Sequence, residues 1–195
     1  MPRRARSARP RRPPTVAFTL LTEDSHPLLY VRLRDLIAAH HGELLDARIA
    51  LAWCTSWKLD VDGHQVLGRC RRATDLDREL HAWDFVILLN REWWEHEQCT
   101  PLQRDALLDH ELCHATTRDD PHTGEPQRDA RGRICYRLRK HDLEEFIAIA
   151  QRWGVWKRDL ELFARGLAMA AARGQRLPID QDPDDPPVQS TGGVH

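Results

Sequence analysis

The chain has 195 residues, of which 29 are lysine or arginine and 30 are aspartate or glutamate, so its formal net charge is −1. This balance excludes a protein that binds nucleic acid or acidic surfaces through bulk charge. The apolar share of 41% suffices for the core of one modest domain, and no apolar run approaches the roughly 20 residues of a membrane helix.

The five cysteines are irregularly spaced, and none belongs to a C-x-x-C pair. An odd count without paired spacing predicts reduced thiols rather than a disulfide framework. The basic N-terminus is not followed by the apolar stretch of a secretory signal. These features predict a cytoplasmic protein without membrane contact. For Cys113 we expect buried packing rather than metal binding.

Both ends of the chain are predicted to be disordered. Residues 1–14 are rich in arginine and proline and contain no acidic residue. A solvated tail is the favoured interpretation of this arm, and weak electrostatic contact with nucleic acid is the alternative. Residues 174–195 are rich in proline, aspartate and glycine. One folded domain is therefore predicted over residues 15–173.

In the first part of this domain, the sequence predicts a helix followed by strands. Pro27 suits the first turn of a helix. Residues 49–57 predict a strand, the turn signal Asp62-Gly63 leads to a second strand near 64–72, and the apolar run in 84–90 suits a buried strand. The expected apolar face of the helix comprises Leu29, Leu33, Leu36, Ile37 and His40.

The most informative pattern is His110-Glu111-Leu112-Cys113-His114, an H-E-x-x-H motif. Thr100-Pro101-Leu102-Gln103 predicts the start of its helix, because threonine and glutamine three residues apart form a capping box. We expect this helix to run from about Pro101 to Thr117. Residues four apart share a helical face, so His110 and His114 can bind one metal ion. Glu111 can then reach a metal-bound water.

A catalytic zinc site commonly needs a third protein ligand, with water in the fourth position. His141 is the favoured third ligand, because it lies at or just before the first turn of a second amphipathic helix. Glu144 and Glu145 are the alternatives in the same turn. That helix is marked by Leu143, Phe146, Ile147 and Ala150, and a last helix by Leu160, Phe163, Leu167 and Ala171. A helix, a small mixed or antiparallel sheet and then further helices predict an α+β fold.

The motif followed by His141 resembles the SprT-like minimal zincins, although Asp142 and Leu143 replace the usual Gly-Pro and the gap from His114 to His141 is longer. The chain is more similar to the family of putative phage metallopeptidases over roughly residues 28–160. This resemblance implies a zincin-like fold and peptidase chemistry. It is carried by Gly68-Arg69-Cys70, residues 84–87, residues 107–114, residues 136–142 and Glu144-Glu145-Phe146.

Motif and resemblance together predict a zinc-dependent peptidase acting on a protein or peptide. Zn²⁺ would be held by His110, His114 and His141, and Glu111 would serve as general base on a zinc-bound water. By analogy with zincins, an edge strand would align the substrate, and residues 84–90 are the nearest candidate, although their apolar run equally suits an interior strand. A second shell that orients the imidazoles is expected from Asp109, Asp119, Asp120 or Asp142.

Two other functions fit the same residues. A non-catalytic binding or regulatory protein could use the metal for stability, although no fourth protein ligand suggests itself. A DNA-associated protease, similar to the SprT-like group, could use the arginine arm for proximity to DNA. For Tyr136 and Arg139, ordinary strand packing and solvated charge are favoured over a role at the oxyanion.

Overall fold

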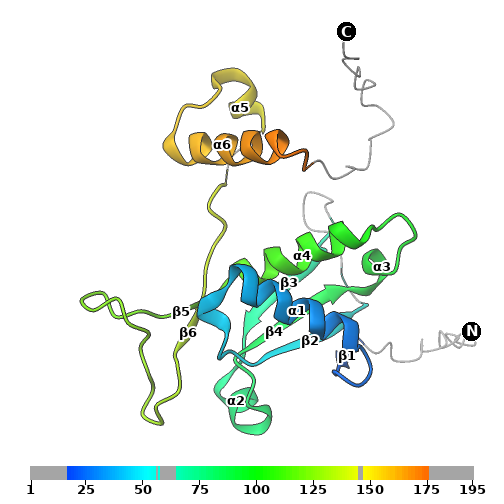
Figure 1. Cartoon of the computed structure of the whole chain (residues 1–195), viewed down its shortest axis with the longest axis vertical. Coiled ribbons are helices and arrows are strands. Elements are labelled where there is room, and N and C mark those ends of the chain that lie inside the picture. The colour runs from blue at the N-terminus through cyan, green and yellow to red at the C-terminus, as the bar shows by residue number, and fades with distance from the viewer. Residues whose placement is uncertain (1–16, 56, 58–64, 145–146, 176–195) are drawn as a thin grey trace, which may run out of the picture. The chain divides into compact units, whose positions relative to one another are not determined.

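The computed structural model describes residues 17–55, 57, 65–144 and 147–175. Within these residues a sheet has four strands in the order β1-β2-β4-β3 (Figure 1). β2 lies parallel to β4, and the two outer strands are antiparallel to their neighbours. Helices and a small mixed sheet confirm the predicted α+β class. The strands are β1 Phe18–Leu21, β2 Ile49–Cys54, β3 Gly68–Arg72 and β4 Phe85–Asn90.

The position of each strand in the sheet follows its composition. β4 is almost entirely buried and occupies the interior, where an apolar run has both faces covered. β3 alternates instead, with Cys70 buried between exposed arginines, and it forms one edge. β2 ends at Cys54, short of the predicted residue 57. The predicted Asp62-Gly63 turn lies outside the described residues.

Two helices pack against each other and share the core of the sheet. α1 spans Pro27–His40 and α4 spans Pro101–Cys113, and Figure 1 shows them as the blue and green ribbons beside the strands. His40 was predicted on the apolar face of α1, but it is exposed, and the next residue, His41, is buried instead. The shared core includes Leu33, Leu36 and Ile37 of α1, Leu108 and Leu112 of α4, and Leu51, Phe85 and Ile87 of the sheet.

The end of α4 differs from the prediction. The helix stops at Cys113, and Ala115–Thr117 form strand β5 instead of a last helical turn. β5 pairs with β6, Tyr136–Leu138, in an antiparallel ladder. Two consecutive β-branched threonines favour extended backbone, and the ladder satisfies the peptide groups that leave the helix.

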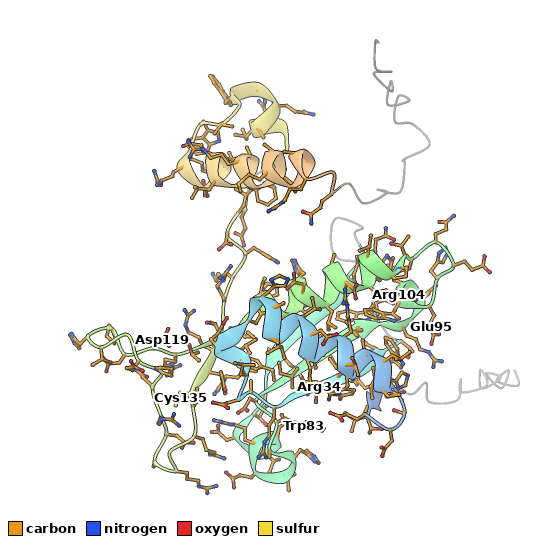
Figure 2. All side chains as sticks on the ribbon, in the orientation of Figure 1. Arg34, Trp83, Glu95, Arg104, Asp119 and Cys135 are labelled. Carbon is orange, nitrogen blue, oxygen red and sulfur yellow. The ribbon has the colours of Figure 1, made fainter. Side chains whose placement is uncertain are left out.

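Residues 118–135 form a long loop between β5 and β6, called the excursion below. Its two arms are tied by the hydrogen bond from Arg118 N to Cys135 O (2.8 Å) and by two isolated bridges, Asp119 with Pro126 and Arg128 with Ile134. Figure 2 labels Asp119 and Cys135 on these arms. The long gap between His114 and His141 is therefore a loop that returns to its starting point.

Two short helices lie within the same unit as the sheet. α2, Asp75–His81, is capped by Thr74, and α3, Arg91–Trp94, is capped by Asn90. No helix in the described part of the chain has both the length and the apolarity to cross a bilayer.

A second unit begins at His141. Its helices are α5, Ile147–Trp153, and α6, Arg158–Ala172, and the latter agrees with the predicted last helix. Leu143 was predicted to belong to α5, but it precedes the described residues of that helix. The predicted tail 1–14 lies outside the described residues, as does 174–195 except for its first two residues.

The capping box of α4 predicts a measurable stability effect. Thr100 Oγ1 accepts from Gln103 N at 3.2 Å, and Gln103 Oε1 accepts from Thr100 N at 2.8 Å. Thr100→Ala should lower the free energy of unfolding by about 1 kcal/mol in urea titrations, because a helical N–H loses its acceptor. Thr100→Ser, which keeps the hydroxyl, should stay close to wild type. Equal losses in both variants would show that the cap is not the cause.

Candidate active site

His110 and His114 come together at the end of α4. Their ring centroids are 5.1 Å apart and their planes meet at 82°. His114 is the C-cap of the helix, but its backbone keeps right-handed helical angles, with φ −74° and ψ −22°. The four-residue spacing thus remains on one helical face although the helix ends at Cys113.

The backbone of Arg139 holds the ring of His114. His114 Nδ1 lies 2.8 Å from Arg139 O, and Arg139 N donates to His114 O at 2.8 Å. Because a carbonyl oxygen only accepts, this contact requires a proton on His114 Nδ1, so Nε2 is the ring nitrogen suited to bind a metal. The orienting group is therefore a main-chain carbonyl. Sequence reasoning missed it, because only the β5–β6 ladder brings Arg139 to His114.

Two of the four acidic residues proposed to orient the imidazoles, Asp109 and Asp120, have other side-chain partners. Asp109 Oδ1 accepts from His41 Nε2 at 2.6 Å. Asp120 accepts from the backbone of His122 and Thr123 within its own turn. The bridge of Asp119 to Pro126 involves only the backbone of Asp119.

Glu111 is buried, with 3% of its surface exposed, and its carboxylate faces β3. Cys70 N donates to Glu111 Oε2 at 2.6 Å. Burial raises the pKa of Glu111, while the hydrogen bond from Cys70 N and the positive charge of Arg69 act in the opposite direction. The predicted general base is thus held by β3, a strand distant in sequence.

Gly68 provides the space for this carboxylate. A Cβ at Gly68 would lie 2.5 Å from Glu111 Oε1 and 3.0 Å from its Cδ. Such contacts are far inside van der Waals distance, so only glycine leaves Glu111 where it is. Gly68-Arg69-Cys70 carried part of the family resemblance, but its role depends on the contact between β3 and α4.

The open edge of β3 borders Glu111. Asn90 N donates to Leu67 O and Ala73 N to Asp84 O, each at 2.8 Å. Since hydrogen-bonded and non-bonded pairs alternate in an antiparallel ladder, the N–H and C=O groups of Gly68, Cys70 and Arg72 point away from β4. Residues 84–90, the nearest edge-strand candidate in the sequence, form the interior strand β4, and β3 is the edge strand beside the candidate base.

His141, the predicted third ligand, is the first residue of the second unit. Only Lys140 separates it from Arg139, whose backbone is bonded to the ring and to the backbone of His114. His110, His114 and His141 remain the candidate metal ligands, and the assignment of His141 stays a prediction.

The structure describes only one of the two alternative third ligands, Glu144 and Glu145. Glu144 belongs to the second unit, where its carbonyl accepts from Lys157 Nζ at 3.2 Å. Glu145 lies outside the described residues.

Tyr136 is a packing residue, as favoured from the sequence. It is 4% exposed, and its ring meets Phe85 at a centroid distance of 5.3 Å. Burial raises the pKa of its hydroxyl to about 12. Arg139 contributes its backbone to the site, and its side chain is exposed.

Cys113 is exposed, so the prediction of buried packing was wrong. The side chain lies one helical step from His114, and the face of α4 that enters the core is that of Leu108 and Leu112.

The cysteines are expected to differ in reactivity. Cys70 is buried, and burial beside Glu111 raises the pKa of its thiol to about 12. Because the thiolate is the reactive form, iodoacetamide should modify Cys113 of the metal-free native protein much faster than Cys70. Peptide mapping by mass spectrometry measures both rates, and denaturant should remove the difference. Comparable native rates would contradict the described burial.

No curated protein and no solved structure matches the chain. A family model described as putative phage metallopeptidase matches residues 24–164, which is more than half of the sequence. The match includes the sheet from β2 onward, the H-E-x-x-H helix and His141. Such a family indicates a protease that depends on a metal ion. The chain therefore belongs to the putative phage metallopeptidase family.

Proposed function

We propose that the chain is a zinc metalloendopeptidase, with His110, His114 and His141 as metal ligands and Glu111 as general base. The observation that carries the proposal is the position of Glu111, a buried carboxylate next to His110 in sequence that accepts from Cys70 N in space left by Gly68. A metal site that only stabilised the fold would not need a buried glutamate next to its histidine ligands.

The donor set fits zinc. Imidazole nitrogens are common zinc ligands, and the contact of His114 Nδ1 with Arg139 O makes Nε2 the nitrogen that would bind the metal. Zinc, when bound, supplies a Lewis acid that activates water and polarises the carbonyl of the scissile peptide. Three protein ligands leave a position open for this chemistry.

Glu111 moves the proton. Its carboxylate accepts the proton of the attacking water and then donates it to the nitrogen of the leaving amine. Burial raises the pKa of Glu111, which makes it a stronger base than an exposed glutamate. The hydrogen bond from Cys70 N holds Oε2 and thereby orients the carboxylate for this transfer.

The edge of β3 is the proposed place for the substrate backbone. The N–H of Cys70 is taken by Glu111, but the peptide groups of Gly68 and Arg72 and the carbonyl of Cys70 point toward this edge, where an extended peptide could add as a further strand. Main-chain pairing of this kind tolerates many side chains, which suits a protein or peptide substrate.

The ligand assignment is tested by zinc content and proteolysis of an unfolded protein substrate. His141→Ala should lose bound zinc and activity, whereas Glu144→Ala and Glu145→Ala should keep both. His122→Ala, which removes an exposed histidine of the excursion, is the matched control. Zinc binding by His141→Ala as tight as in wild type would show that the third ligand is another residue. A wild-type protein without stoichiometric metal would remove the enzyme hypothesis.

A further inference from the structure

A second group of metal-ligating side chains lies on the neighbouring face of α4. It consists of His41, Asp109 and Cys113, and each offers one ligand atom within 4.8 Å of the others. Asp109 and Cys113 are four residues apart, like His110 and His114, but displaced by one residue. One residue corresponds to about 100° around a helix, so the two pairs point in different directions.

The third member of the group comes from α1. His41 follows the last residue of this helix and is 5% exposed. Its Nε2 donates to Asp109 Oδ1 at 2.6 Å, so an imidazole and a carboxylate already face each other across α1 and α4. If only His41 and Asp109 were present, their hydrogen bond would be a sufficient reason for their closeness. The thiol of Cys113 beside them adds a donor with high affinity for transition metals.

The chemistry of the group selects a class of ion. Nitrogen, oxygen and sulfur donors together suit Zn²⁺ and similar divalent transition metals, and not Ca²⁺ or Mg²⁺, which prefer oxygen alone. The carboxylate and the thiolate supply two negative charges, which neutralise a divalent ion beside the buried His41. Asp109 and Cys113 are only partly covered, with Cys113 exposed, so an ion can enter from solvent.

We propose that His41, Asp109 and Cys113 form a second, thiolate-containing site for a divalent transition metal, separate from the histidine site. An ion here would join the end of α1 to α4, the helix that carries His110, Glu111 and His114. Its expected role is to stabilise the folded protein and hold this helix, because a ligand that binds only the folded state raises its stability.

Cobalt titration of the metal-free protein tests the proposal. Wild type should bind a second equivalent of Co²⁺ and develop a near-ultraviolet thiolate-to-cobalt charge-transfer band. The variant His110→Ala/His114→Ala should keep this band while losing the other equivalent, and its melting temperature should rise when Co²⁺ is added. Cys113→Ser should lose the band, and Asp109→Asn should weaken it.

Cys135→Ser is the matched control, because Cys135 is the other described cysteine that is not buried, and this variant should behave like wild type. Circular dichroism before metal addition verifies that each variant is folded. A single equivalent without a thiolate band in folded wild type overturns the proposal. A band that survives in Cys113→Ser overturns it as well, because the thiolate must then come from another cysteine.

Discussion

Glu111→Gln is expected to bind zinc as tightly as wild type and to hydrolyse peptide bonds about 10²- to 10⁴-fold more slowly, the usual contribution of a general base. Glutamine has nearly the same shape, and its amide oxygen can still accept from Cys70 N, which bonds Glu111 at 2.6 Å. The fold and the metal ligands are therefore preserved, and only the capacity to take a proton is lost. Steady-state proteolysis and zinc content measure the two effects separately.

The control for this variant is Glu125→Gln, which makes the same change at an exposed position of the excursion. It should leave the rate unchanged. If Glu111→Gln retained wild-type activity with a normal zinc content, the carboxylate would not be the base, and a metal site with a structural purpose would be the better hypothesis.

Gly68→Ala is expected to have the second largest effect. The added Cβ would stand 2.5 Å from Glu111 Oε1, so the buried carboxylate must move away from its hydrogen bond with Cys70. A displacement of about 1 Å at a catalytic group can cost on the order of 10²-fold in rate. Overpacking of this kind should also lower the free energy of unfolding by about 1–3 kcal/mol. Rates and urea titrations measure the two losses.

Gly42→Ala is the matched control, since a Cβ at Gly42 meets nothing within 4 Å. It should be close to wild type in both measurements. Zinc content should stay normal in Gly68→Ala, because the substitution does not touch a histidine. Full activity in this variant would show that the position of Glu111 against β3 is not needed for catalysis.

Local signals in the sequence were sufficient for the elements that local interactions define. The start of α4 follows from Thr100 and Gln103, whose capping box forms as predicted. The strand at Phe85–Asn90 follows from its apolar run. β1 was not predicted, because its four residues are mostly exposed and are held by pairing with β2. The end of α4 was predicted too late, because the alternative to helix at Ala115–Thr117 is a ladder with residues some twenty positions away.

The sequence by itself determined the chemistry of this protein: two histidines at helical spacing with a glutamate between them, and a family whose model matches residues 24–164. These depend on the identity and spacing of residues within one helix, which local geometry sets. Only the tertiary structure decided which groups surround them. Arg139 O orients His114, Gly68 and Cys70 hold Glu111, and His41 meets Asp109. Each of these contacts joins segments that are far apart in sequence, so it exists only once the sheet and the helices have packed.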